Sequence, residues 1–205
     1  MRPHIITFSG LAHSGKDTSA DYLVAKFNQL GIKAIKMGLA DRLKVISQKL
    51  IKLFYDIDIP IEEFYDMEKK ELVREDFPDF EGKSFKLRTV LQKVGTEIFR
   101  DMLWGGIWCD YIAKNLAKFD EYQVIIISDC RFPDELDYFK QLRSRQLLSI
   151  RVDRPSAEKL AADNQTHASE IHVNSLPVDR TIDNSGTLED LYSKLDLLLC
   201  SAIKL

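Results

Sequence analysis

The sequence predicts an α/β fold built on a parallel sheet, and three features of the chain indicate it. An apolar run at residues 4–9 stops at a glycine, as expected for a strand that is covered on both faces. A second run, residues 124–127, is β-branched throughout. Helical patterns alternate with these and other strand-like segments, which favours parallel strands joined by right-handed crossovers.

The individual elements follow from local patterns along the chain. Strands are predicted at residues 4–9, 32–37, 124–129, 147–152 and 179–183. Helices are predicted at residues 16–30, from 39 to a break at 59–61, at 62–74, 87–100, 104–119 and 133–143, and from 187 onward. The last helix begins with Thr187 and has Asp190 three residues later, a spacing typical of a reciprocal N-terminal cap.

Apolar residues at helical spacing predict which helix faces are buried. The predicted buried residues are Leu43, Ile46, Leu50 and Leu53 in one helix, Leu87, Val90, Leu91, Val94 and Ile98 in another, and Leu188, Leu191, Leu195 and Leu198 in the last. A glycine, Gly95, lies inside the middle one, at a cost of about 1 kcal/mol relative to alanine. We therefore expect another group to approach the backbone there.

A glycine-rich turn between the first strand and the first helix has the spacing G-x-x-x-x-G-K of a phosphate-binding loop, or P-loop. Glycine lets the backbone approach a polyphosphate, and the free N–H groups of the turn and of the helix start form an anion site. Asp17 stands where serine or threonine usually follows the lysine. The residues predicted to bind the nucleotide here are Gly10, His13, Ser14, Gly15, Lys16, Asp17 and Thr18.

A carboxylate and an arginine, Asp129 and Arg131, follow the strand at 124–129. Ligands of open α/β sheets bind at the carboxyl ends of the strands, where such a carboxylate orders Mg²⁺ in P-loop proteins. Carboxylate and hydroxyl oxygens suit that ion. The predicted metal-binding residues are accordingly Asp17, Thr18 and Asp129.

Polar residues recur every four positions in the helix at 87–100, namely Arg88, Gln92, Thr96 and Arg100. A solvated helix face explains this row as well as a binding face does, and from the residues alone the solvated face is the better interpretation.

The composition of the chain limits the functions that it can have. The 205 residues fit one domain with ordinary hydrophobic content, and the net charge of −3 argues against binding a nucleic acid polymer. Three widely spaced cysteines without a C-x-x-C pair favour a reducing compartment and no zinc site. Without a signal-peptide pattern or an apolar run of about 20 residues, we expect an intracellular protein that does not enter a membrane.

Taken together, the motifs resemble those of a known family. They are Gly10-x4-Gly15-Lys16-Asp17-Thr18, the segment 39–44, Gly95-Thr96-Glu97 with Arg100 and Trp108, Asp129-x-Arg131-Phe132-Pro133-x-Glu135, His167-x-Ser169-Glu170, and Asp183-Asn184-x-Gly186-Thr187. In this order they resemble the deoxynucleoside monophosphate kinases of tailed phages and large DNA viruses, within the nucleoside monophosphate kinase group of P-loop proteins.

The resemblance implies a single P-loop kinase domain over residues 1–205, with the P-loop NTPase fold. It implies a five-stranded parallel sheet of order 2-3-1-4-5 with helices on both faces, a helical acceptor-binding region at about 39–118 and a lid at about 154–176. The substrates would be ATP with Mg²⁺ and a deoxynucleoside monophosphate. Arg151 and Arg154 flank the lid, which has no paired arginines inside it.

The resemblance also assigns roles to residues. Lys16, Asp129 and Arg131 would be catalytic, and Asn184 and Gly186 would lie beside the adenine. The acceptor would be bound by Arg42, Lys44, Arg88, Gln92, Thr96, Arg100, Trp108, Arg131 and Glu170.

Two other functions stay open from the sequence. One is a P-loop kinase for another phosphorylated acceptor, of the dephospho-coenzyme A or phosphomevalonate type, and the other is a non-catalytic nucleotide-gated switch. The expected location is the cytoplasm, or the host cytoplasm if the protein is viral. A homodimer is the commonest assembly for such a chain.

Overall fold

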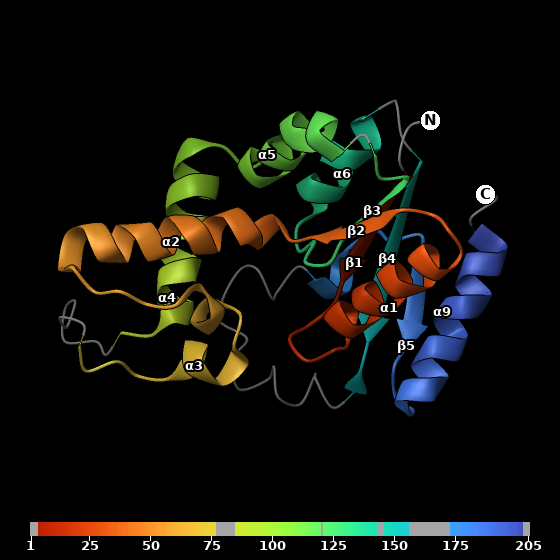
Figure 1. Cartoon of the computed structure of the whole chain (residues 1–205), viewed down its shortest axis with the longest axis horizontal. Helices are drawn as coiled ribbons and strands as arrows, with labels where there is room; N and C mark the ends of the chain where they lie inside the picture. The colour runs from red at the N-terminus through yellow and green to blue at the C-terminus, as the bar shows by residue number, and fades with distance from the viewer. Residues whose placement is uncertain (1–3, 77–84, 120, 143–145, 156–172, 203–205) are drawn as a thin grey trace. The chain divides into compact units, whose positions relative to one another are not determined.

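The computed structural model describes residues 4–76, 85–119, 121–142, 146–155 and 173–202 (Figure 1). The chain forms two compact units. One comprises residues 1–39 and 109–205 and contains the sheet, and the other comprises residues 40–108 and is helical.

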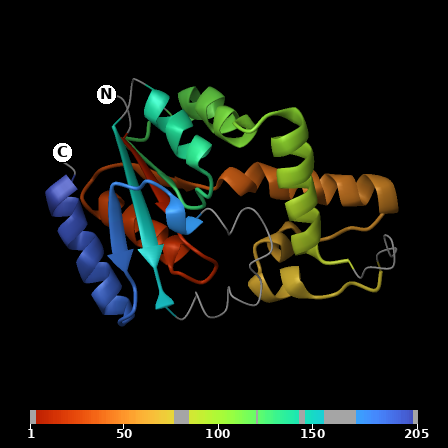
Figure 2. The same ribbon diagram turned by 180° about the vertical axis from the view of Figure 1, so that it is seen from behind.

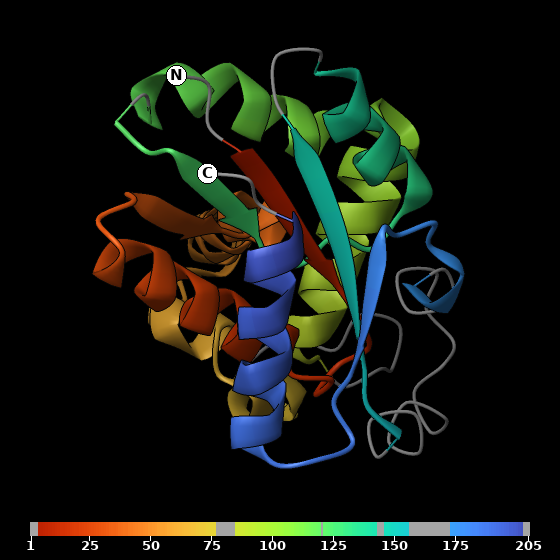
Figure 3. The same cartoon turned by 90° about the vertical axis from the view of Figure 1, so that its right-hand side faces the viewer.

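The sheet of the first unit has five parallel strands in the order β2-β3-β1-β4-β5, which confirms the predicted order (Figure 3). The strands are β1 (His4–Ser9), β2 (Ala34–Met37), β3 (Val124–Ile127), β4 (Leu147–Asp153) and β5 (Arg180–Asp183). All four residues of β3 are buried, as its unbroken β-branched run predicts. Figure 2 shows β4 and β5 side by side and running the same way. In their register, Val152 lies opposite Ile182.

Helices cover both faces of this sheet. They are α1 (Lys16–Gln29), α5 (Ile107–Asn115), α6 (Pro133–Gln141) and α9 (Leu188–Ala202), with short 3-10 turns η3 (Leu116–Phe119) and η4 (Val173–Ser175). The chain steps from β1 to β2 in one direction along the sheet and from β3 to β4 in the other. Right-handed crossovers therefore place α1 and α6 on opposite faces.

The main core lies between the sheet and the pair of helices α1 and α9. Leu23 and Phe27 of α1 and Leu191 and Leu195 of α9 pack with Phe8 and other strand residues. Each of these side chains is almost fully buried, and burying one contributes about 1.5–3 kcal/mol to folding. The strand ends that carry the predicted site residues therefore project from a rigid support.

The predicted cap of α9 is confirmed, whereas one of its predicted core residues is not. Thr187 Oγ1 accepts from the Asp190 amide at 3.2 Å, and the Asp190 carboxylate accepts from the Thr187 amide at 2.9 Å. Leu188 is 48% exposed, because it lies in the first turn among the exposed capping residues.

Where the structure describes it, the helical unit contains five helical elements. They are α2 (Leu39–Tyr55), whose first residue belongs to the sheet unit, η1 (Ile61–Phe64), α3 (Met67–Glu71), α4 (Leu87–Gln92) and η2 (Lys93–Leu103). The predicted helix at 62–74 is wrong. Asp66 accepts a hydrogen bond from the Lys69 amide and so starts a separate short helix, and Arg74 forms an antiparallel bridge with Phe85.

The predicted helix at 87–100 is α-helical only to Gln92. From Lys93 to Leu103 it winds as a π-helix, whose i→i+5 hydrogen bonds widen each turn. Widening moves Ile98 off the apolar face, and its side chain is 45% exposed rather than buried as predicted. Gly95 is buried, and a Cβ added there would touch the side chain of Leu43. This confirms the expected close approach.

The buried side of α2 is also shifted from the prediction. Leu43, Ser47 and Ile51 are buried at a spacing of four, whereas Leu53 is 76% exposed. Ser47 was not predicted to be buried, because the buried face was predicted from apolar residues alone and serine is polar. Among the described residues, no helix has both the length and the apolar character that crossing a membrane requires.

Candidate active site

The P-loop connects β1 to α1 and has backbone conformations that favour glycine. Gly10 has φ of 149° and Gly15 has φ of 98°, and His13 also lies in the left-handed region at 65°. A Cβ on Gly10 would lie 2.6 Å from the carbonyl oxygen of Val152 in β4. The glycine at the end of β1 is therefore required both by its dihedral angles and by the neighbouring strand.

Lys16 begins α1 and is almost fully buried, with 7% of the residue exposed. Its Nζ lies 3.4 Å from the carbonyl oxygen of Leu11, to which it donates, and 4.0 Å from the carboxylate of Asp17. Burying an ammonium group is costly unless anions or carbonyl groups surround it. The lysine is thus held over the loop, where a phosphate would compensate its charge.

The hydroxyl group of Ser14 is buried and has no hydrogen-bond partner within the described part of the chain. Most buried polar groups in native proteins are hydrogen-bonded, so an unpaired one in a phosphate-binding loop is a donor available to a ligand. The loop therefore fits a polyphosphate group by its chemistry as well as by its spacing.

Asn184 follows β5 and contacts the loop. Its side-chain Nδ2 donates to the carbonyl oxygen of Ser14 at 2.8 Å, and this bond is buried. Its backbone amide donates to the carbonyl oxygen of Asp153 at 2.7 Å. Gly186, the other residue predicted beside the adenine, lies against Asp190, whose Oδ2 would be 2.5 Å from an added Cβ. Contact of either residue with adenine stays a prediction.

The three predicted metal-binding residues come from two separate segments of the sheet unit. Asp17 and Thr18 lie in the first turn of α1 and are exposed, and Asp129 follows β3 and is half-buried. Within the described residues, no group of three or more carboxylate, histidine or cysteine side chains could hold a metal ion. Mg²⁺ usually binds one or two carboxylates together with phosphates and water, so this donor set fits that ion.

The loop after β3 is held by a residue that the sequence did not single out as functional. The Glu135 carboxylate is buried and accepts from the backbone amides of Arg131 at 2.7 Å and Phe132 at 3.1 Å. The sequence signal was available, since glutamate three residues into a helix commonly caps its start. Glu135 thereby fixes the main chain that carries Arg131.

Cys130 lies between the two predicted catalytic residues and is fully buried. Burial and the nearby Glu135 raise the pKa of its thiol well above the usual value of 9.0. Because the thiol stays protonated at neutral pH, it packs as an apolar group and is no nucleophile.

Several predicted acceptor residues of the helical unit are engaged with neighbours. Arg88 forms an ion pair with Glu71 of α3. Lys44 lies 3.3 Å from the carboxylate of Asp41 and 3.6 Å from the centre of the Tyr65 ring, and the Tyr65 hydroxyl donates to the same carboxylate at 3.0 Å. These contacts fix the direction of both cations within the unit.

Two further acceptor candidates, Arg100 and Trp108, hydrogen-bond to backbone carbonyl groups of the same unit. Arg100 donates to the carbonyl oxygen of Gly105 at 3.0 Å. Trp108 is buried, donates through Nε1 to the carbonyl oxygen of Gly95 at 3.2 Å, and packs on Phe99 with ring centres 5.3 Å apart. Arg42 is exposed on α2, and Gln92 and Thr96 are half-buried. Glu170, with His167, Ser169 and most of the predicted lid, lies outside the described residues.

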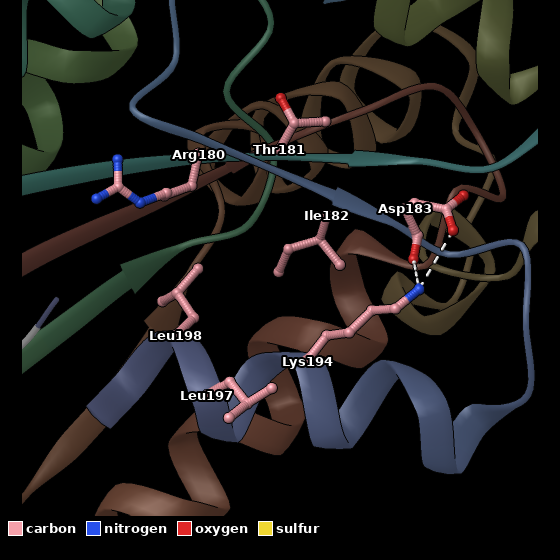
Figure 4. A pocket seen from close by; sticks show the side chains of 7 residues that line it. All are labelled: Arg180, Thr181, Ile182, Asp183, Lys194, Leu197 and Leu198. Atoms are coloured by element: carbon pink, nitrogen blue, oxygen red, sulfur yellow. Dashed lines mark hydrogen bonds and ion pairs between the residues drawn. The ribbon is translucent and has the colours of Figure 1, made fainter. Parts of the chain in front are cut away.

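A shallow pocket of about 390 Å³ lies between β5 and α9 (Figure 4). Its lining residues are Arg180, Thr181, Ile182, Asp183, Lys194, Leu197 and Leu198. Lys194 donates to the backbone carbonyl oxygen of Asp183 at 2.5 Å and lies 3.2 Å from its carboxylate. None of the residues predicted to bind nucleotide lines this pocket.

Comparison with known proteins identifies the family. The sequence model of a family described as deoxynucleotide monophosphate kinase matches residues 35–195. The chain belongs to the deoxynucleotide monophosphate kinase family. It is 30% identical over 202 residues to a putative deoxynucleotide monophosphate kinase of Acanthamoeba polyphaga mimivirus, with 93% of each chain covered.

A phage kinase and a solved structure are also similar to this chain. The deoxynucleotide monophosphate kinase of Enterobacteria phage T4 is 25% identical over 242 residues, with 93% of this chain and 96% of that kinase covered. Among solved structures, TT1252 from Thermus thermophilus superposes with a TM-score of 0.51 at 17% identity, over 99% of this chain and 100% of the other. That likeness concerns the fold alone.

Proposed function

We propose that this protein transfers the γ-phosphoryl group of ATP to the phosphate of a deoxynucleoside monophosphate, giving ADP and a deoxynucleoside diphosphate. The observation that carries the proposal is the P-loop of a chain in this kinase family. Its two glycines have left-handed dihedral angles, its lysine is buried, and the Ser14 hydroxyl has no partner in the described part of the chain.

The donor triphosphate is bound by the loop. Backbone amides and the start of α1 supply N–H donors, the Ser14 hydroxyl adds another, and Lys16 places its charge on the outer phosphate. His13 is exposed in the loop and is proposed to contact the phosphates. Asn184 and Gly186 are proposed to lie on the side of the base.

Bound Mg²⁺ would neutralise charge on the donor phosphates, and Asp17, Thr18 and Asp129 are the residues proposed to hold it, directly or through water. The Asp129 carboxylate is already oriented by the Leu39 amide, which donates to it at 2.6 Å.

Arg131 is proposed to contact the transferred phosphoryl group, because its main chain is fixed by Glu135 and a guanidinium can bind phosphate through two hydrogen bonds. The reaction then depends mainly on positioning and on stabilising charge. The acceptor phosphate is itself an anion, so no general base is required.

The acceptor is assigned to the helical residues. Arg42, Lys44, Arg88, Gln92, Thr96, Arg100 and Trp108 are proposed to bind the monophosphate, together with Arg131 and Glu170. Eight of these residues carry a charged or polar group that can bind phosphate or base, and Trp108 can pack against the base.

The two other functions considered from the sequence have no observation in their favour, since family membership assigns a nucleotide acceptor. The cytoplasmic location and the homodimer stay predictions.

The test is an ADP-release assay with Mg²⁺-ATP and, in turn, each deoxyribo- and ribonucleoside monophosphate, dephospho-coenzyme A and phosphomevalonate, followed by chromatography of the products. We expect a deoxynucleoside diphosphate to form in equal amount with ADP for at least one acceptor. ADP release without a new diphosphate would indicate a nucleotide-gated switch. Turnover of dephospho-coenzyme A or phosphomevalonate alone would indicate a kinase with a different acceptor.

A further inference from the structure

The side chain of Asn184 and the P-loop are 170 positions apart in the sequence and meet in the core of the sheet unit. Asn184 Nδ2 donates to the carbonyl oxygen of Ser14 at 2.8 Å, and the residue is buried. A carbonyl oxygen can only accept, so the side-chain NH₂ group must face the loop.

The position of Asn184 is set by the sheet. Asp183 of β5 pairs with Asp153 of β4, and the next amide, that of Asn184, donates to the carbonyl oxygen of Asp153 at 2.7 Å. Strands β4 and β5 therefore position this side chain against the loop, independently of the loop's own backbone.

The bond fixes the peptide that joins Ser14 to Gly15. In a trans peptide, which is planar, the C=O and N–H bonds point in opposite directions. The described residues contain no cis peptide. When Asn184 holds the Ser14 carbonyl, the Gly15 N–H must point away from Asn184.

Gly15 itself is shaped by the same contact. Its φ is 98°, and an added Cβ would lie 2.5 Å from Asn184 Nδ2. The second glycine of the motif is thus required by the approach of Asn184 as well as by its dihedral angles.

We propose that Asn184 is a positioning residue, which orients the Gly15 amide as a phosphate donor by holding the Ser14 carbonyl group. Asn184 acts through the loop and contributes to binding any polyphosphate. The inference rests on the proposed function only in that the loop binds a polyphosphate, and it does not depend on the acceptor. It differs from contact with adenine, which would affect ATP alone.

Two probes separate these roles. Inorganic tripolyphosphate has no base, whereas a non-hydrolysable ATP analogue has both base and phosphates. We expect Asn184→Ala to raise the dissociation constants of both probes by the same factor, about three- to tenfold, which is the loss typical of one hydrogen bond. Loss of affinity for the ATP analogue alone would overturn the proposal in favour of contact with the base.

The Asn184→Asp variant is a second and independent test of the positioning role. The protonated carboxyl group has the same shape as the amide and can donate to the Ser14 carbonyl, whereas the carboxylate cannot and repels it. Burial raises the pKa of a carboxyl group, so the carboxyl group of this variant should lose its proton between about pH 5 and 8. We expect the ratio of variant to wild-type dissociation constants for tripolyphosphate to fall towards one at pH 5 and to rise at pH 8.

The charged groups around position 184 do not account for the expected pH dependence of this ratio. Hydrogen bonds from Ser185 and Lys194 lower the pKa of Asp183, and the Thr187 amide lowers the pKa of Asp190, so both stay ionised over this range. His13 and Lys16, which flank the Ser14–Gly15 peptide in the sequence, and Lys194 are present in both the variant and the wild type, so any effect they have cancels in the ratio. The same holds for Arg151 and Asp153, which form an ion pair at the end of β4.

Asn115→Asp is the matched control. Its Nδ2 also donates to a backbone carbonyl oxygen, that of Tyr111 at 2.7 Å, but the bond is exposed and lies in α5. This variant should bind both probes as the wild type does at every pH.

Thermal unfolding without ligand shows whether a loss of affinity comes from the orientation of the loop or from a loss of folded protein. Unchanged affinity for tripolyphosphate in a folded Asn184→Ala variant, or a flat pH ratio for Asn184→Asp, would overturn the proposal. A wild-type protein that binds tripolyphosphate but phosphorylates no deoxynucleoside monophosphate would contradict the proposed function and leave this inference intact.

Discussion

The carboxylate of Asp129 accepts a hydrogen bond of 2.6 Å from the backbone amide of Leu39. The two residues follow the neighbouring strands β3 and β2, whose register places Met37 opposite Ile127. The bond therefore ties two adjacent strand ends together at the edge where ligands of α/β sheets bind. It also sets the direction in which the carboxylate points.

Asp129→Asn keeps an oxygen that can accept from Leu39 and removes only the charge. We expect the thermal midpoint to change little and kcat/KM to fall about 10- to 100-fold, the loss typical of groups that orient a metal. The measurement is kcat/KM across a Mg²⁺ titration. Asp137→Asn, on the exposed side of α6, is the control. Normal kinetics in Asp129→Asn would exclude a role at the metal.

Lys16→Ala tests the P-loop itself. Because the ammonium group is buried over the loop, its removal should lower kcat/KM about 10²- to 10³-fold, as for loss of a preorganised electrostatic group. Circular dichroism should show an intact fold. Lys33→Ala is the control, since Lys33 is exposed and pairs with Glu121. Near-normal turnover in Lys16→Ala would remove the loop from the mechanism.

Arg131→Ala should lower kcat more than it weakens ATP binding, because the guanidinium is proposed to stabilise charge that develops in the transition state. Glu135 holds the backbone amide of residue 131, so truncating the side chain should leave the loop in place. The checks are kcat and the dissociation constant of a non-hydrolysable ATP analogue, with Arg180→Ala on β5 as the control. A pure loss of ATP affinity would contradict the proposed role.

Much of the fold could be predicted because its signals are local. The strand at Val124–Ile127 is buried on both faces, and a parallel strand of this kind has an unbroken apolar sequence. The P-loop was equally visible, because its residues are contiguous and their spacing is dictated by the phosphate group.

The parts that could not be predicted depend on contacts between distant residues. Nothing next to Asn184 indicates that it binds the Ser14 carbonyl, and nothing next to Asp129 indicates Leu39. The π-helix at Lys93–Leu103 was also missed, because its residues suit an α-helix and tertiary packing decides the winding. Gly95 marked the place of that packing, although not the partner.

Asp196 on α9 gives the stability of the sheet unit a pH dependence. Its carboxylate accepts from Lys26 Nζ and from the Tyr22 hydroxyl of α1, each at 2.9 Å, while Tyr22 stacks on Tyr192 with ring centres 4.0 Å apart. The hydrogen bond from Lys26, followed by that from Tyr22, lowers the pKa of Asp196 below its ordinary value of 3.8.

A carboxyl group with a lowered pKa stabilises the folded state above its unfolded pKa and loses that contribution as the pH falls through the folded value. Asp196→Asn should therefore be less stable than the wild type at pH 7, by about 0.2–1 kcal/mol for a partly exposed pair. The difference should shrink below about pH 4, as measured by urea unfolding. A difference that is constant from pH 7 to pH 3 would show that packing, rather than charge, is lost.

Gly95 and Leu43 should be energetically coupled within the helical unit. A Cβ on Gly95 would touch the Leu43 side chain, which is buried. Alanine favours a helix over glycine by about 1 kcal/mol, but overpacking a core costs about 1–3 kcal/mol. Gly95→Ala should therefore be less favourable in the wild type than in the Leu43→Ala background.

A double-mutant cycle measures this coupling. Leu43→Ala alone should destabilise by about 2–5 kcal/mol. Adding Gly95→Ala to Leu43→Ala should recover stability, because the space vacated by leucine accommodates the new methyl group and the helix gains propensity. We expect a coupling free energy of about 1–2 kcal/mol from urea unfolding of the four proteins. Additive effects would mean that Leu43 moves aside without cost, and that the glycine is not required by this contact.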